Sequence, residues 1–105
     1  MNVRATRIAA DPAKAAADGG ASYLAMVESM KQLEGFLGAL MLADRKTGDS
    51  LGLTFWKDEA TLKASEEVAN KFRREGANTV GATTPPVVER FEVVYYGVPE
   101  KAAIR

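Results

Sequence analysis

The sequence predicts a small α+β protein of the ferredoxin-like type, with the order β-α-β-β-α-β and a four-stranded antiparallel sheet that carries two helices on one face. Two apolar, strand-like segments at residues 36–43 and 51–56 flank a polar turn. Helical periodicity precedes and follows this pair, and one further strand-like segment lies near each end of the chain. The 105 residues are expected to form one domain spanning residues 1–105.

The first third of the chain is predicted to contain a strand and a helix. Residues 3–9 favour a strand, and Asp11 followed by Pro12 suits a turn into helical structure. Residues 22–34 are expected to form the first long helix, because apolar side chains recur there at steps of three and four. These side chains are Tyr23, Met26, Met30 and Leu33. Gly35 is the expected stop of this helix.

The second half is predicted to be a hairpin, a long helix and a last strand. Residues 44–49 form the expected hairpin loop, with Gly48 supplying a positive φ. Asp58 is placed to cap the second helix. The side chains expected to form its inner stripe are Leu62, Ser65, Ala69, Phe72, Gly76 and Val80. Residues 87–96 then read as the last strand.

Apolar side chains on both faces of the central strands predict a homodimer. Leu40 and Leu42 are expected to share a face with Phe36, whereas Met41 faces the other way. Two helices cover one face of a sheet, and a second apolar face exceeds the patch usual for a soluble monomer. The tail at residues 97–105 is too short and polar to cover that face well. Two copies packed about a twofold axis would cover it.

The composition excludes several classes of function. Lysine plus arginine and aspartate plus glutamate both number 14, so nothing in the net charge favours nucleic acid or a membrane surface as a partner. The sequence has no cysteine and no histidine, which removes thiolate chemistry, the Ser-His-Asp triad and the commonest metal ligands. The first residues lack the apolar core of a signal peptide, and a cytoplasmic location is expected.

The central segment resembles the antibiotic-biosynthesis-monooxygenase-like proteins of the dimeric α+β-barrel superfamily. The resemblance lies in GF-x-G at residues 35–38, in DR-x-TG at residues 44–48, in a strand that closes on Trp56, and in the helix opening DEATLKASEE. It implies a pocket between sheet and helices. Members include cofactor-independent oxygenases of aromatic polyketides, haem-degrading enzymes and proteins without an assigned reaction. Haem degraders place a histidine on the helix after Trp56, and this chain has none.

Trp56 is the first candidate for substrate binding. The resemblance implies that it lines the pocket, where it would stack on a planar substrate. The alternative is a large residue that closes the core or the dimer interface. Five further candidates are chosen by residue type: Tyr95, Tyr96, Arg90, Asn70 and Arg73. Their alternatives are ordinary strand aromatics and solvent-facing helix or strand polar groups, and no catalytic residue is assigned.

Two functions stay open from the sequence. One is a cofactor-independent monooxygenase acting on an aromatic or polyketide-like substrate, which needs a dry pocket, a proton acceptor and an oxyanion donor but no cofactor or metal. The other is a protein that binds a small ligand, or serves as an accessory or interaction domain, without catalysis. In both, the expected partners are a second copy of the chain and a small aromatic molecule.

Overall fold

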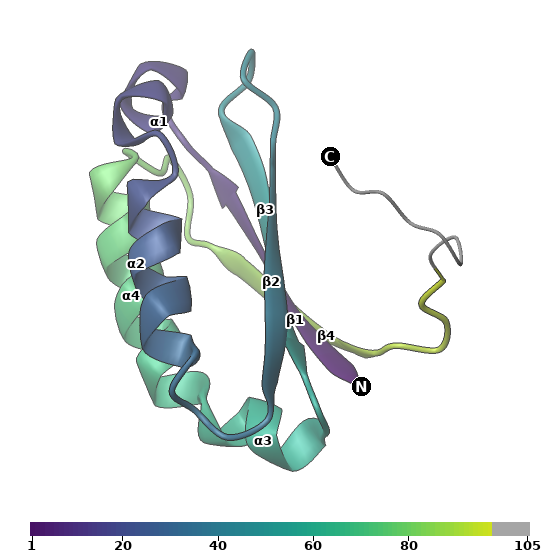
Figure 1. The fold of residues 1–105 in the computed structure, drawn as a ribbon. Helices are drawn as coiled ribbons and strands as arrows, with labels where there is room; N and C mark the ends of the chain where they lie inside the picture. The colour runs from purple at the N-terminus through teal and green to yellow at the C-terminus, as the bar shows by residue number, and fades with distance from the viewer. Residues whose placement is uncertain (98–105) are drawn as a thin grey trace.

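The computed structural model describes residues 1–97 and confirms the predicted α+β ferredoxin-like fold (Figure 1). The sheet has four antiparallel strands in the order β2-β3-β1-β4. Of the tail at residues 97–105, which was expected to leave the outer face uncovered, residues 98–105 lie outside the described residues. The elements in chain order are β1 (Asn2–Ala9), α1 (Pro12–Asp18), α2 (Ala21–Met30), β2 (Phe36–Ala43), β3 (Asp49–Trp56), α3 (Glu59–Ala64), α4 (Glu66–Thr79) and β4 (Val87–Glu92).

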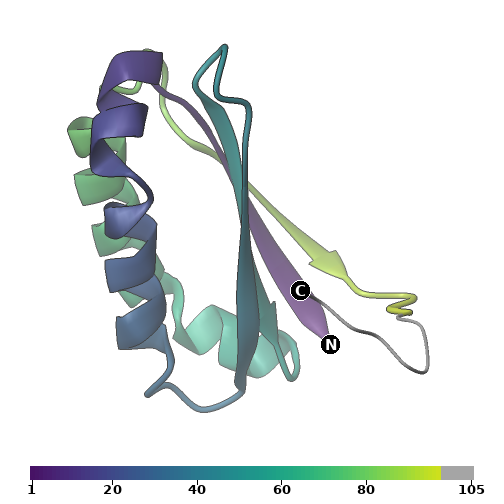
Figure 2. The ribbon, with the colours of Figure 1, turned by 45° about the horizontal axis from the view of Figure 1, so that its top comes forward.

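The two long helices, α2 and α4, lie side by side on one face of the sheet (Figure 2). Gly35 and Gly48 have φ angles of 81° and 84°, as expected of the helix stop and the hairpin loop. A Cβ on Gly48 would lie 2.3 Å from the carbonyl oxygen of Ala10, so the loop also packs tightly against the chain after β1. No helix within residues 1–97 is long and apolar enough to cross a membrane.

The prediction for Phe36 is wrong. The register between β2 and β3 shifts between Phe36 and Gly38, so Phe36 lies opposite Trp56 instead of sharing a face with Leu40 and Leu42. The two rings meet edge to face, with centroids 5.3 Å apart. A one-residue irregularity reverses which face a side chain takes, and simple alternation along a strand does not reveal it.

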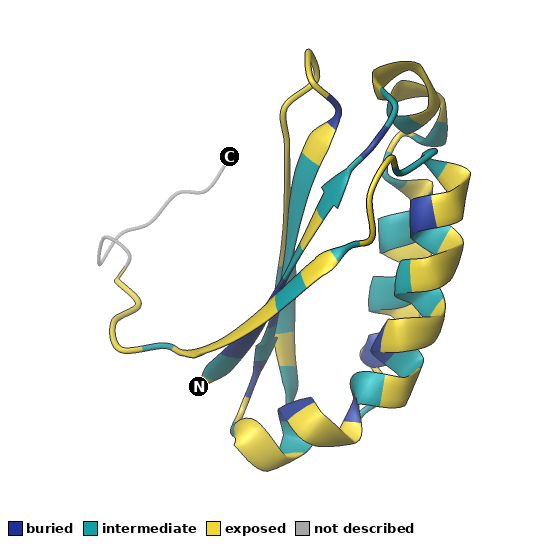
Figure 3. Ribbon diagram, turned by 180° about the vertical axis from the view of Figure 1, so that it is seen from behind, coloured by how far each residue is buried: buried dark blue, intermediate teal, exposed yellow. Residues whose placement is uncertain are grey.

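The core lies where α2 and the α3–α4 junction meet the end of β3. Its buried residues are Met30, Trp56, Leu62 and Ala69, with Met26, Leu33 and Phe36 packed against them. In Figure 3 the buried positions are few and scattered over strands and helices, and half-buried and exposed positions are common on the strands. Much of the sheet is therefore only half covered in the single chain.

The second helix is broken where a continuous helix was expected. α3 ends at Ala64 and α4 begins at Glu66, and Ser65 joins them. The Leu62 carbonyl accepts hydrogen bonds from the Ser65 amide, the Ser65 hydroxyl and the Arg4 guanidinium. These contacts replace the ordinary helical partner of this carbonyl, so the break is stabilised by a side chain from β1.

The last strand is shorter than predicted. β4 ends at Glu92, not at residue 96. β4 pairs with β1, and the register brings Glu92 opposite Asn2, the first residue of β1. Val93 adds one more backbone hydrogen bond, of 2.8 Å, to the Met1 carbonyl. Among residues 1–97, the β-branched and aromatic residues that follow Val93 have no neighbouring strand.

Candidate functional site

A cavity lies between the sheet and the two long helices. The cavity has a volume of about 80 Å³, which is room for several water molecules. Its floor comes from β1, β2 and β3, and its roof from α2 and α4. The side chains of the floor include Arg4, Thr6, Ile8, Met41, Ser50 and Thr54. Those of the roof include Ser22, Tyr23, Met26, Ala69, Phe72, Arg73 and Val80.

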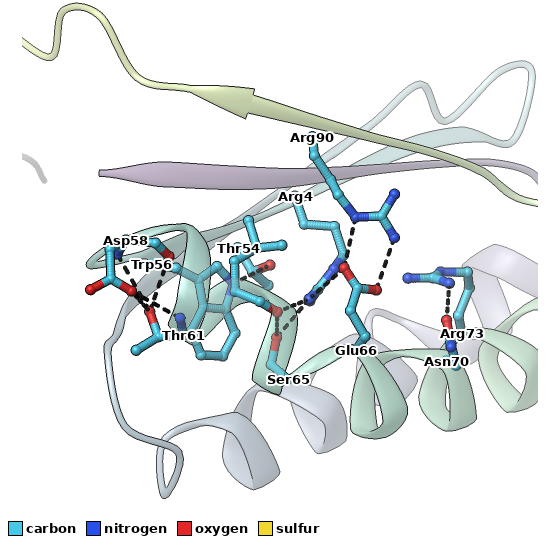
Figure 4. A network of polar contacts seen from close by, with 11 residues as sticks. Arg4, Thr54, Trp56, Asp58, Thr61, Ser65, Glu66, Asn70, Arg73 and Arg90 are labelled. Atoms are coloured by element: carbon cyan, nitrogen blue, oxygen red, sulfur yellow. Dashed lines mark hydrogen bonds and ion pairs between the residues drawn. The ribbon is translucent and has the colours of Figure 1, made fainter.

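Arg4 is buried at one end of this cavity. Only 2% of it is exposed, although it is a charged residue; it sits on β1, one of the two inner strands of the sheet. Its Nη2 donates to the Leu62 carbonyl at 2.9 Å and to the Ser65 hydroxyl at 2.6 Å (Figure 4). The same nitrogen lies 3.4 Å from Glu66 Oε1. Arg4 is thus fixed by the helix break described above.

Glu66 joins Arg4 to Arg90. The two oxygens of Glu66 accept hydrogen bonds from Arg90 Nε at 2.7 Å and Nη2 at 2.9 Å, a two-point pairing of carboxylate and guanidinium. These hydrogen bonds lower the pKa of Glu66 and raise that of Arg90. Burial lowers the pKa of Arg4, and the Glu66 charge opposes this change. All three groups are therefore charged at neutral pH.

Arg73 enters the cavity from α4. Its Nη1 donates to the Asn70 side chain one turn earlier (Figure 4). Its pKa is lowered by burial and then by the nearby Arg4 charge. Nε and Nη2 of Arg73, and Nε and Nη1 of Arg4, are buried and have no hydrogen-bond partner within residues 1–97. Four guanidinium nitrogens thus lack an acceptor from the described chain, which is uncommon for buried polar groups.

Trp56 stands behind the cavity wall. It is fully buried, and its indole N–H donates to the Thr54 hydroxyl at 3.0 Å. The Arg4 guanidinium carbon lies 5.8 Å from the centroid of its ring. Trp56 thus contacts two residues that line the cavity and is itself part of the core. Direct stacking of Trp56 on a substrate stays a prediction.

Tyr23 is held across the cavity by two backbone carbonyls. Its hydroxyl hydrogen is shared between the Leu53 carbonyl oxygen, at 2.8 Å, and the Leu40 carbonyl oxygen, at 3.1 Å. Burial raises the pKa of Tyr23 to about 12. Its ring passes over Gly52, where a Cβ would lie 2.6 Å from Tyr23 Cε1. Tyr23 is therefore a fixed wall, and Gly52 provides the room for it.

The structure separates the six residues predicted from sequence. Within the part of the chain that the structure describes, only Arg73 of these six lines the cavity. Asn70 accepts a hydrogen bond from Arg73 and so orients it. Arg90 pairs with Glu66 at the exposed edge of the charged cluster formed by Arg4, Glu66, Arg73 and Arg90. Tyr95 and Tyr96 follow β4 and are exposed, and the ring of Tyr96 lies 6.4 Å from that of Phe55, which points away from the helices. Binding roles for these residues stay predictions.

Sequence reasoning missed Arg4, Glu66, Tyr23 and Asp18. A signal for Arg4 exists: β1 alternates, so Arg4 shares the helix-facing side with Ile8, and an arginine at such a position needs partners. Asp18 also lines the cavity and accepts a hydrogen bond of 2.7 Å from the Ser22 hydroxyl. Asp18 and Ser50 line the cavity at one end. Thr54, four positions further along β3, pairs with Arg4, so the cavity has a cationic end and a carboxylate end.

Comparisons with known proteins identify the fold. No family model and no curated protein matches the sequence. Solved structures do match. A monooxygenase of Streptomyces coelicolor in complex with nanaomycin D has a TM-score of 0.71 at 18% identity, covering 93% of this chain and 91% of that one. A protein of unknown function from Nitrosomonas europaea has a TM-score of 0.72 at 19% identity, covering 93% of both chains.

A cofactor-independent oxygenase of Streptomyces nogalater is also similar, with a TM-score of 0.65 at 13% identity and coverage of 94% of this chain and 97% of that one. The chain therefore has the fold of the antibiotic-biosynthesis-monooxygenase-like proteins, and the resemblance drawn from residues 35–67 is confirmed at the level of the fold. Identities this low carry no residue roles from one protein to the other.

Proposed function

We propose that this protein is a homodimer that binds a small aromatic or polyketide-like molecule in the cavity between its sheet and helices, and oxidises it with molecular oxygen without a cofactor. The observation that carries the proposal is the cavity itself. It combines apolar walls with buried N–H groups from Arg4 and Arg73 that lack a partner in the described chain. Cavities of this make-up are the usual sites of small ligands.

The chemistry requires three things from the protein. An electron-rich anthrone or hydroquinone must lose a proton, and the resulting enolate or phenolate oxygen must be stabilised. The carbanionic substrate then reduces oxygen. For an anthrone, the methylene carbon becomes a carbonyl with one oxygen atom, and the other oxygen atom leaves as water with two hydrogens. Excluding bulk water favours the charged intermediate over side reactions.

The lining of the cavity offers groups for each of these tasks. The guanidinium groups of Arg4 and Arg73 can donate to a developing oxyanion. Asp18, at the other end, is the carboxylate placed to accept a proton. Met26 and Phe72 give an apolar surface to a planar ring. The chemistry therefore needs no group that the chain lacks.

The homodimer is supported by the outer face of the sheet. Leu40 and Phe91 are 47% and 52% exposed in the single chain, and half-buried leucines on β3 lie between them. By strand alternation these side chains point away from the helices. A second copy would cover this apolar face, and burial of about 800 Å² per subunit suffices for a standard interface.

A second function is favoured by one specific observation. The guanidinium of Arg4 is already engaged by Leu62 and Ser65, so the site is rigid and suited to hold a ligand without turnover. A small-ligand-binding or accessory protein of this fold would use the same cavity.

Oxygen uptake tests the proposal. The purified protein is mixed with anthrone and with naphthohydroquinones in an oxygen electrode, and the product is identified by mass. The proposal expects catalysed uptake that falls at least tenfold in Asp18→Asn and is unchanged in Asp11→Asn, whose carboxylate caps α1 outside the cavity. Quenching of Trp56 fluorescence by these compounds without oxygen uptake would assign the binding function instead.

A further inference from the structure

At one end of the cavity, buried Arg4 and half-buried Arg73 each have guanidinium nitrogens without an acceptor in the described chain. Arg4 is 98% buried, since its exposure is 2%, and its Nε and Nη1 have no partner in the part of the chain that the structure describes. Arg73 contributes Nε and Nη2 in the same condition. A buried N–H of a charged group without an acceptor is costly, so an acceptor that reaches these nitrogens at this end of the cavity would be favoured.

The charges of this cluster do not balance. Three guanidinium groups, those of Arg4, Arg73 and Arg90, interact electrostatically with one carboxylate, Glu66. The net charge of these four side chains is +2. Both oxygens of Glu66 already bind Arg90, and one of them also lies beside Arg4. The negative charge of Glu66 therefore mainly balances the positive charge of Arg90. The guanidinium groups of Arg4 and Arg73, which lie further inside, are left without a full counter-charge.

The two inner arginines face a common space. Both line the same cavity, and Figure 4 shows the guanidinium of Arg73 turned toward the side of α4 where Glu66 and Arg4 meet. Planar guanidinium groups match the geometry of a carboxylate, which offers two oxygens in one plane. The rest of the lining is largely apolar and includes Ile8, Met26, Met41, Phe72 and Val80.

We propose that the cavity takes a ligand with an organic carboxylate, which Arg4 and Arg73 bind, and an aromatic or aliphatic body that lies along the apolar lining. The proposal rests on the proposed function, because it names the chemical class of the ligand in that cavity. Asp18 lies at the opposite end, so it does not compete for the two arginines and favours one orientation of the anion.

Matched pairs of ligands test the proposal. Isothermal titration calorimetry compares 2-naphthoate with 2-naphthamide, which has the same ring and a neutral head. The wild-type protein is expected to bind 2-naphthoate at least tenfold more tightly. Arg73→Gln is expected to reduce this preference at least fivefold. Arg74→Gln, on the exposed neighbour of Arg73, is the control and is expected to keep the preference.

Further arms keep the test decisive. Arg73→Lys retains the charge without the planar fork, and its preference is expected to fall between those of the wild type and Arg73→Gln. Circular dichroism verifies that each variant is folded. Acetate, a carboxylate without a ring, is expected to compete only at concentrations at least tenfold higher than 2-naphthoate. Equal competition by acetate would assign a site for small free anions and contradict the proposal.

The outcomes also separate this inference from the proposed function. Equal affinity for the acid and the amide, or a preference unchanged by Arg73→Gln, overturns the carboxylate inference while the cavity still binds a small aromatic molecule. Failure of both compounds to bind overturns the carboxylate inference and counts against small-molecule binding as well. Oxygen uptake with neutral anthrone, together with no preference for carboxylates, would leave the proposed oxidation alone standing.

Discussion

The guanidinium of Arg4 lies 5.8 Å from the centre of the Trp56 ring, and both residues are buried where β1 begins and β3 ends. The tryptophan thus contacts the residue that closes the cationic end of the cavity. An arginine over an aromatic face is stabilised by about 0.5–1 kcal/mol at an exposed site and by about 2 kcal/mol when desolvated. Trp56 therefore positions Arg4 and reports on it.

Replacement of Trp56 is expected to destabilise the protein strongly. Trp56→Ala should lower the free energy of unfolding by about 3–5 kcal/mol, because it leaves a large hole in the core. Urea unfolding followed by circular dichroism measures this change. Lys71→Ala, on the exposed side of α4, is the control, with an expected effect within about 0.5 kcal/mol. A loss below about 1 kcal/mol for Trp56→Ala would show that the tryptophan is not part of the core.

Two glycines that line the cavity are expected to respond in opposite directions to alanine. Gly52→Ala puts a Cβ 2.6 Å from the Tyr23 ring, and overpacking of this kind costs about 1–3 kcal/mol. Gly76→Ala meets only Ser22 Cβ, at 3.8 Å, and should stabilise α4 by about 0.5–1 kcal/mol. Thermal unfolding compares the two variants. A Gly52→Ala protein as stable as the wild type would contradict the position of Tyr23.

The dependence of stability on pH should reveal the Glu66 pairing. Its folded-state pKa is lowered from 4.5, so its contribution to stability is present above about pH 4.5 and is lost as the pH falls through the folded-state value. Glu66→Gln should cost about 1–3 kcal/mol at pH 7 and progressively less below pH 4.5. Glu67→Gln serves as the exposed neighbouring control. A difference that does not vary with pH would rule out a charged Glu66 in the cluster.

A charge on the outer face of the sheet should disrupt the proposed dimer. Leu40→Glu places a carboxylate on the face that two copies would share, and sedimentation velocity is expected to show a shift from dimer to monomer. Leu24→Glu changes an exposed leucine on α2, at 59% exposure, and should leave the mass unchanged. A wild-type protein that sediments as a monomer at micromolar concentration would overturn the dimer.

Strand and helix positions were predictable where period and turn signals agree. An apolar run followed by a turn with Gly48 predicted the strand at residues 36–43, and the structure confirms it. The inner stripe of α4 was predictable from its helical spacing. The break at Ser65 was not predictable, since it depends on a hydrogen bond from Arg4, a residue 61 positions away. Nor was the end of β4, which depends on where its partner strand begins.

The site was harder to predict for the same reason. Residue type alone selects Arg73, but also Tyr95, which is 85% exposed in the structure. The decisive feature is a set of guanidinium nitrogens on Arg4 and Arg73 that have no acceptor within residues 1–97, and it arises only when β1 and α4 are packed together. Burial and missing partners are properties of the fold, so a pattern along one chain shows neither.

The measurement that tests the central claim most directly is a titration of the isotope-labelled protein with 2-naphthoate, followed by amide resonances in NMR. The cavity account predicts that the amides of Gly52 and Gly76, which line the cavity from opposite layers, shift together and to saturation. The amide of Lys46, which lies outside that lining in the exposed loop between β2 and β3, should shift little. Shifts confined to the outer face of the sheet, or no shifts at millimolar ligand, would contradict the account.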